Sequence, residues 1–119
     1  MRVQSFVLKL TSEDPELLRS FYEDILELPP REGMGEGAFA LGDATLIIDW
    51  HSETKGQTNE PHRVLLDFYV EDLPEEQAQL EARGVEFIRR EGKEWWGGII
   101  STFLDPDGNY CQLIEYRPD

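Results

Sequence analysis

One segment near the end of the chain predicts a single local structure, a β-hairpin with a tight turn. The turn reads Asp105-Pro106-Asp107-Gly108-Asn109, and the residues around it, from Phe103 to Glu115, are rich in strand formers. Pro106 presets φ for the second turn position, Asp105 can accept hydrogen bonds from the backbone ahead of it, and Gly108 accepts a positive φ. We therefore predict a hairpin at the C-terminal end of the chain.

The same order of elements occurs in both halves of the chain. Apolar residues alternate over residues 4–10, which predicts a strand, and Asp14 followed by Pro15 predicts the start of a helix. Alternation returns over residues 63–71 and is followed by a second helix start at Asp72. The further features expected are a helix stop at Pro29-Pro30, strands over 37–41 and 44–50, a helix C-cap at Gly84, and strands over 85–89 and 98–104.

The length of 119 residues allows one domain with a single core. Within this domain we expect a first unit over residues 1–50, a linker over 51–62 and a second unit over 63–119. The linker is rich in Ser, Thr, Gly, Asn and Pro, which is typical of a connecting segment.

Charge and cysteine content restrict the partners and the setting. The formal net charge is -14, so phosphate groups would be repelled and nucleic-acid binding is not expected, whereas a cationic ligand would be attracted. An acidic surface can equally serve solubility or adaptation to salt. No apolar run is long enough to span a bilayer. Cys111 is the only cysteine and is expected in the core, so a reducing cytoplasm is the simplest setting.

Three motifs resemble those of the vicinal oxygen chelate superfamily, which holds glyoxalases, ring-cleaving dioxygenases and bleomycin-resistance proteins. They are the closing hairpin, the helix segment Ser20–Leu28, and Trp96-Gly97-Gly98. The helix segment is similar to a family signature, except that Leu28 replaces the usual glycine. The resemblance covers nearly the whole chain and implies an α+β fold. In that fold two βαβββ units form a cupped mixed sheet, with helices on the outer face and the ligand inside.

The resemblance also implies four positions at which family enzymes hold a divalent metal, usually with His, Glu or Gln side chains. Alignment of the two halves places these positions at Val7 or Ser5, Leu46, Leu65 and Gln112. Val and Leu cannot coordinate a metal ion, and a single Gln binds one too weakly to hold a site. We therefore expect no metal and no cofactor. The two histidines, His51 and His62, flank the linker and are expected to be solvent-exposed.

Without a metal, the inner face of the cup reads as an apolar and aromatic pocket with a few polar groups. The residues expected to contact a ligand are Val7, Lys9, Leu46, Ile48, Trp50, Leu65, Asp67, Tyr69, Trp95, Trp96, Tyr110, Gln112 and Ile114. Lys9 and Asp67 occupy equivalent positions in the two halves. One expectation is that they form an ion pair at the floor of the cup, or that Asp67 binds a cationic group of the ligand. The other is that both side chains face solvent and contribute little energy.

Taken together, these features favour a metal-independent protein that binds an aromatic or cationic small molecule. The acidic excess and the Trp-Gly loop are similar to the bleomycin-resistance branch, which sequesters an antibiotic and forms homodimers. An enzyme of the lyase, isomerase or dioxygenase kind with an atypical metal site is the alternative, and a regulatory metabolite-binding domain is a third. We expect a homodimer, because open sheet edges are usually covered.

Overall fold

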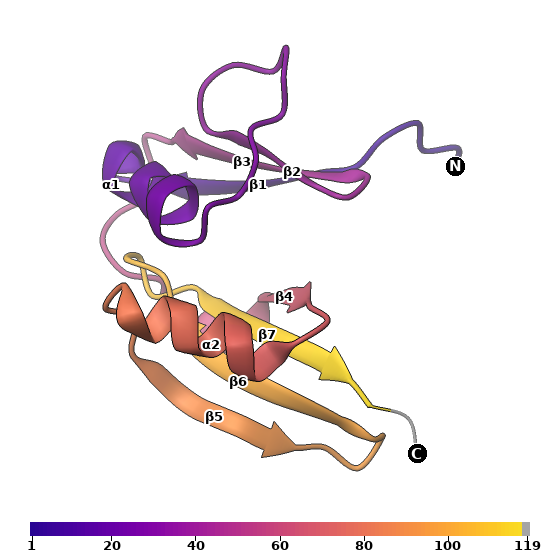
Figure 1. Ribbon diagram of the computed structural model, residues 1–119. Helices are drawn as coiled ribbons and strands as arrows, with labels where there is room; N and C mark the ends of the chain where they lie inside the picture. Colours follow the sequence, from indigo (N-terminus) through magenta and orange to yellow (C-terminus); the bar gives the residue numbers. More distant parts are fainter. Residues whose placement is uncertain (118–119) are drawn as a thin grey trace. The chain divides into compact units, whose positions relative to one another are not determined.

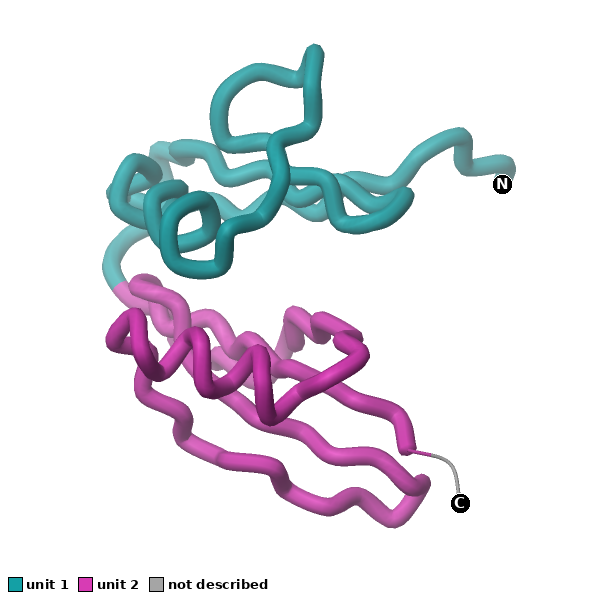
Figure 2. Tube along the Cα trace, viewed as in Figure 1, with its two compact units in different colours: residues 1–56 teal, residues 57–119 magenta. Residues whose placement is uncertain are grey.

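The computed structural model describes residues 1–117 and divides the chain into two compact units, residues 1–56 and residues 57–119 (Figure 2). The last two residues of the expected second unit lie outside the described part. The boundary falls between Gly56 and Gln57, inside the expected linker, because the linker is anchored on both sides. Gly56 N donates to Glu13 Oε1 over 3.0 Å in unit 1, and Gln57 Nε2 donates to the Pro106 carbonyl over 2.7 Å in unit 2.

Unit 1 contains a small mixed sheet and one helical segment (Figure 1). Its elements are β1 (Val7–Ser12), α1 (Pro15–Ser20), the π-helical turn η1 (Phe21–Ile25), β2 (Ala38–Leu41) and β3 (Ala44–Trp50). The strand order is β1-β3-β2, with β1 parallel and β2 antiparallel to β3. An isolated bridge from Pro30 to Phe39 stands where a further strand would pair with β2.

The predicted helix start and hairpin of unit 1 are confirmed. The Asp14 carboxylate accepts a hydrogen bond from Leu17 N over 3.2 Å, and Pro15 occupies the first helical position. Gly42, at φ 59°, makes the short turn between β2 and β3. The first strand begins later than expected, at Val7. Phe6 therefore lies outside the strand and is 67% exposed.

Unit 2 contains a four-stranded mixed sheet and a longer helix. Its elements are the 3-10 turn η2 (Pro61–Arg63), β4 (Leu65–Tyr69), α2 (Leu73–Ala82), β5 (Phe87–Lys93), β6 (Gly98–Leu104) and β7 (Tyr110–Tyr116). The strand order is β4-β7-β6-β5, with β4 parallel to β7 and the other pairs antiparallel. Both units thus follow the βαβββ order, reduced in unit 1 by the bridge, and the α+β prediction is confirmed.

Helix α2 has the ends that the sequence predicts. The Asp72 carboxylate accepts from Glu75 N over 3.2 Å at the N-terminus. At the C-terminus, Gly84 has φ 95°, and its N–H donates to the Glu81 carbonyl while Val85 N donates to the Leu80 carbonyl. These two bonds form a Schellman motif, which satisfies carbonyls at the helix end.

The closing hairpin is held by one buried carboxylate. Asp105, 4% exposed, accepts hydrogen bonds from Asp107 N, Asn109 N and Asn109 Nδ2, at 2.9, 2.9 and 2.8 Å. Gly108 has φ 83°, as the predicted turn requires. A Cβ atom at Gly108 would lie 2.7 Å from Gln57 Oε1, so this glycine also makes room for the start of unit 2.

Each helix covers one face of the sheet in its own unit. Helix α1 contacts β1 and β3, and α2 contacts β5, β6 and β7 (Figure 1). In unit 2, hydrogen bonds from Leu73 N to Glu115 Oε1 and between Ser101 and Gln77 mark the covered side of the strands. The core residues on that side and on α2 are Leu66, Leu73, Gln77, Leu80, Ile99, Ser101, Phe103, Cys111 and Leu113. Cys111 is fully buried there, as predicted. No helix within residues 1–117 is long and apolar enough to cross a membrane.

Candidate functional site

The opposite side of the unit 2 sheet, which we call the helix-free face, carries most of the predicted site residues of this unit. The cross-strand pairs that define it include Asp67–Gln112 and Tyr69–Ile114, because paired residues project to the same side. Its side chains come from all four strands: Leu65, Asp67, Tyr69, Arg89, Ile100, Thr102, Leu104, Tyr110, Gln112, Ile114 and Tyr116.

One end of the helix-free face carries a pair of stacked aromatic rings. The rings of Trp96 and Tyr116 are stacked, with centroids 5.9 Å apart and an interplanar angle of 27°. Trp96 lies over the backbone of Gly98, where a Cβ atom would come within 2.0 Å of the indole ring. Gly98 pairs with Tyr116 across the sheet, so the absence of a side chain at this position creates the seat for the indole. Trp95 lies at the tip of the β5–β6 turn and is 95% exposed.

The centre of the helix-free face is polar and rich in hydrogen-bond acceptors. Gln112 Nε2 donates to Thr102 Oγ1 over 3.1 Å, which leaves the amide oxygen of Gln112 without a hydrogen bond from residues 1–117. Asp67 stands beside Gln112 on the neighbouring strand. Its carboxylate has neither a hydrogen bond nor an ion pair within the described part of the chain. Partial burial raises the pKa of Asp67 above its ordinary value.

A second glycine shapes the far edge of this face. Gly92 on β5 pairs with Ile100, and a Cβ atom at Gly92 would come within 2.0 Å of the Arg89 guanidinium group. The guanidinium group therefore occupies the space that a side chain at position 92 would fill. Its charge is balanced by Glu94, whose Oε2 lies 2.8 Å from Arg89 Nη2.

In unit 1, Leu46 and Ile48 face the opposite way from the prediction. Their cross-strand partners are Leu8 and Leu10, and Phe39 also pairs with Leu46. Phe39 contacts Tyr22 of the helical segment, with centroids 6.5 Å apart, so this is the helix-covered side. Leu46 and Ile48 are 1% and 0% exposed and belong to the core of unit 1.

The physical reason is a register difference of one residue between the two units. The turn from β2 to β3 is short, whereas the turn from β6 to β7 runs through Asp105–Asn109. Leu46 and Gln112 occupy the same position counted from the start of β3 and of β7. Gln112 nevertheless projects to the helix-free side and Leu46 to the helix-covered side. A shift of one residue moves every side chain of a strand to the other face. Thr45 and Ile47 occupy the helix-free side of β3.

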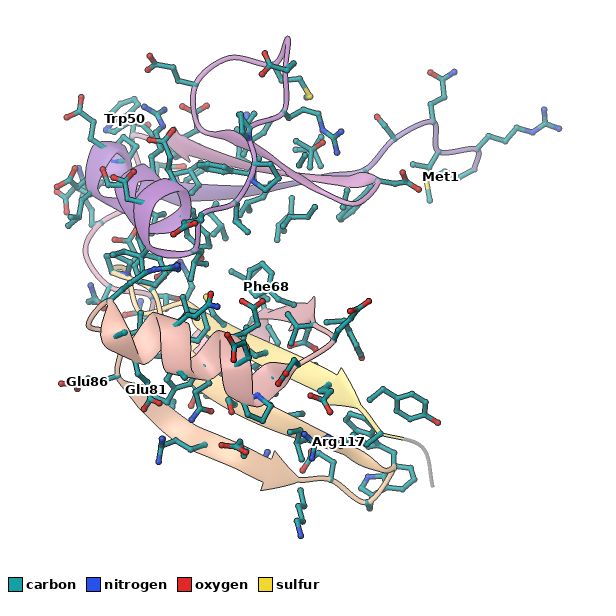
Figure 3. All side chains as sticks on the ribbon, in the orientation of Figure 1. Met1, Trp50, Phe68, Glu81, Glu86 and Arg117 are labelled. Carbon is teal, nitrogen blue, oxygen red and sulfur yellow. The ribbon has the colours of Figure 1, made fainter. Side chains whose placement is uncertain are left out.

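The other predicted residues of unit 1 lie at exposed positions. Val7 and Lys9 are on the helix-free side of β1. Trp50 shares the facing of Leu46 and Ile48, opposite to the prediction, and is 57% exposed at the end of β3 (Figure 3). Lys9 Nζ lies 3.6 Å from Asp49 Oδ2, so an exposed carboxylate of its own unit neutralises this lysine. The predicted relation between Lys9 and Asp67 stays a prediction.

None of the four positions discussed for a metal carries an imidazole or a carboxylate. Leu65 and Gln112 lie on the helix-free face of unit 2, and Val7 lies on the corresponding side of unit 1. Within residues 1–117, no group of three or more His, Cys, Asp or Glu side chains is placed to hold a metal ion. His51 accepts a hydrogen bond from Glu53 N, and the His62 ring packs edge-on against Tyr110.

Unit 1 has a polar hollow that the sequence did not predict. It lies between α1 with η1 and the loop before β2, and has a volume of about 740 Å³. Its charged lining residues are Glu16, Arg19, Glu23, Arg31, Glu32 and Glu36. Both arginines are engaged with the backbone, Arg19 with the Ile48 carbonyl and Arg31 with the Gly42 and Ala44 carbonyls.

Sequence reasoning missed the contributions of β5 and β6 to the helix-free face of unit 2, namely Arg89, Ile100 and Thr102. Strand β6 is buried on both sides, so its apolar residues show no alternation from which a face could be assigned. The bulges in β5 likewise disturb its alternation, and Glu91 has φ 48° there.

Residues 4–113 match the sequence profile of the Glyoxalase/Bleomycin resistance protein/Dioxygenase superfamily. This match and the two βαβββ units agree with each other. The chain belongs to the Glyoxalase/Bleomycin resistance protein/Dioxygenase superfamily.

Solved structures with the same fold come from several bacteria. TnmS3, an antibiotic-binding protein from Streptomyces sp. CB03234, is 21% identical with a TM-score of 0.70, and the match covers 97% of each chain. An integron cassette protein from the mobile metagenome of V. cholerae is 23% identical with a TM-score of 0.74 over 98% of each chain. A family enzyme from Burkholderia phytofirmans PsJN is 17% identical with a TM-score of 0.72, over 92% of this chain and 95% of the other. No curated protein matches the chain.

Proposed function

We propose that this protein binds a small organic molecule without a metal ion, on the helix-free face of unit 2. The observation that carries this proposal is the exposure of large apolar side chains around the acceptor groups at the centre of that face. Tyr69 is 71% exposed, Tyr116 60% and Leu65 46%. Exposed apolar residues gathered on one side of a sheet are typical of a binding surface.

The residues at the metal positions support binding without a metal. Leu65 and Gln112 stand on this face, and neither provides the imidazole or carboxylate that a divalent transition metal prefers. In unit 1, Val7, Thr45 and Ile47 are on the helix-free side and are equally poor ligands. The antibiotic-binding relative TnmS3 supports sequestration of a toxic compound as the biological role.

Two further features are proposed with this function. A homodimer is supported by the edge strands β1 and β4, each of which stands at the end of its sheet within residues 1–117. A cytoplasmic setting is supported by the single, fully buried cysteine, Cys111.

The test is a binding experiment with controlled metal content. The protein is purified without chelator, its metal content is measured, and tryptophan fluorescence is followed against a panel that includes bleomycin-type cations and glutathione adducts. We expect saturable binding that is unchanged by EDTA, with the compound recovered intact. Stoichiometric Ni, Zn, Mn or Fe, loss of binding in EDTA, or chemical conversion of the compound would instead favour the metal-dependent lyase, isomerase or dioxygenase.

A matched pair of variants locates the site. Leu65→Ala removes an exposed leucine from the helix-free face, and Leu17→Ala removes a comparably exposed leucine (55%) from α1. We expect Leu65→Ala to weaken binding about three- to tenfold, from the apolar contact area lost, and Leu17→Ala to leave it unchanged. Equal effects of the two substitutions would contradict the assignment to unit 2.

A further inference from the structure

The helix-free face of unit 2 has two chemically different ends at a fixed separation. Asp67 and Gln112 form one row across β4 and β7, Tyr69 and Ile114 form the next, and Tyr116 lies two residues further along β7. Strands rise about 3.3 Å per residue, so the Asp67 row lies about 13 Å from the Tyr116 row, with Tyr69 midway.

The aromatic end is ordered before any ligand arrives. Trp96 lies over the Gly98 backbone and stacks on the Tyr116 ring. Gly97, at φ 93°, allows the turn that presents the indole, and its N–H donates to the Glu94 carbonyl. Rings that are already fixed lose little conformational freedom on binding, and they favour planar partners.

The acidic end presents acceptors and a negative charge. The Asp67 carboxylate is unpaired within residues 1–117, and the amide of Gln112 directs its oxygen away from the Thr102 hydroxyl that takes its N–H. Two neighbouring acceptors, one of them charged, are satisfied together by a donor that carries several N–H groups and a positive charge. A protonated amine, an amidinium or a guanidinium group has this chemistry.

The arginine that β5 places on the helix-free face is already paired. Arg89, the cation on the same face, is paired with Glu94 on its own hairpin. The net charge of -14 adds a long-range attraction for cations.

We propose that the ligand of this face is a cationic aromatic compound, whose planar ring packs on Trp96 and Tyr116 and whose positively charged nitrogen binds Asp67 and Gln112. This inference rests on the proposed small-molecule function and adds the class of ligand. It assigns Asp67 as the residue that selects for charge and Trp96 as the residue that binds the ring.

Dansylcadaverine is a suitable probe, because a flexible chain joins its fluorescent ring to a primary amine. Its N-acetylated form keeps the ring and loses the charge, and pentylamine keeps the single charged amine and loses the ring. We expect the wild-type protein to bind dansylcadaverine at least about tenfold more tightly than either analogue, as for a charge-assisted hydrogen bond.

Three variants separate the two ends. Asp67→Asn is expected to weaken the binding of dansylcadaverine about tenfold and to leave the binding of the acetylated probe unchanged. The variant would then no longer discriminate between the charged and the uncharged probe. Trp96→Leu is expected to weaken the binding of both probes by the same factor, because both contain the ring. Glu86→Gln is the control, because it removes a negative charge from an exposed position at the opposite end of the unit 2 sheet from Arg117 (Figure 3). It is expected to change the binding of neither probe. Thermal unfolding of each variant verifies that it is folded.

The outcomes distinguish the two proposals. If the wild-type protein binds compounds of the panel but does not prefer the amine probe to its acetylated form, the cationic aromatic class is wrong and the small-molecule function stands. The same holds if Asp67→Asn retains full discrimination. If nothing in the panel binds, both proposals fail.

Discussion

The indole of Trp96 stacks on the ring of Tyr116, with centroids 5.9 Å apart, and occupies the space that a side chain at position 98 would fill. We predict that Gly98→Ala destabilises the protein by about 1–3 kcal/mol, because the new methyl group must displace the indole or press on the Glu115 carbonyl 2.8 Å away. Chemical denaturation measures the loss, and near-ultraviolet circular dichroism reports the displaced ring. If Trp96→Ala and Gly98→Ala are fully additive in the double variant, the packing relationship is wrong.

The Asp105 carboxylate is expected to be the main stabiliser of the closing turn. Asp105→Ala leaves three donors without their partner in a buried position, and we predict a loss of about 2–4 kcal/mol. Asp43→Ala changes an exposed aspartate in the turn of the other hairpin and is predicted to stay within about 0.5 kcal/mol. Similar effects of both substitutions on the free energy of unfolding would contradict this account.

Two adjacent isoleucines test the register of β3. Ile48 is fully buried on the helix-covered side, and Ile47 is half-buried on the other side. We predict that Ile48→Ala costs about 2–5 kcal/mol of stability and that Ile47→Ala costs distinctly less. A larger loss for Ile47→Ala than for Ile48→Ala would mean that Ile48 projects to the helix-free side, as the sequence alignment of the two halves implied.

The stability contributed by Glu115 is expected to depend on pH. Hydrogen bonds from Arg117 and from Leu73 N hold the pKa of Glu115 below its ordinary value of 4.5. A lowered pKa in the folded state gives stability that is fully present above about pH 4.5 and is lost as the pH falls through the folded-state value. Glu115→Gln is therefore predicted to be less stable than wild type at pH 7, with a difference that shrinks toward pH 3 in urea denaturation. A difference that is the same at both pH values would refute the assignment.

Local signals in the sequence predicted the helix starts, the C-terminal end of α2 and the closing turn. Asp14, Asp72 and Gly84 mark helix ends because their capping interactions depend on residues close in the chain. The closing turn is equally local, since Asp105 accepts hydrogen bonds from Asp107 and Asn109 within its own loop. Such features can be predicted without knowledge of the tertiary structure.

The expected facing of the strand residues agrees with the structure on β4 and differs from it on β3. The alternation of β4 gave the correct facing of Leu65, Asp67 and Tyr69 in unit 2. The facing of Leu46 depends on which residue of β1 pairs with it, and that register is set by the turn and by packing against α1. Strand β3 does contain a signal for its facing, because the apolar residues Leu46 and Ile48 alternate with the polar residues Thr45 and Asp49, but the alignment of the two halves overrode it.

The central claim is that a small molecule binds the helix-free face of unit 2 without a metal. Nuclear magnetic resonance of the ¹⁵N-labelled protein, titrated with dansylcadaverine in the presence of EDTA, tests it directly. We predict that the indole N–H of Trp96 and the side-chain amide of Gln112 shift together and saturate with one binding curve. Shifts confined to the hollow of unit 1, at residues such as Arg31 and Glu36, or shifts that require an added metal ion, would contradict the claim.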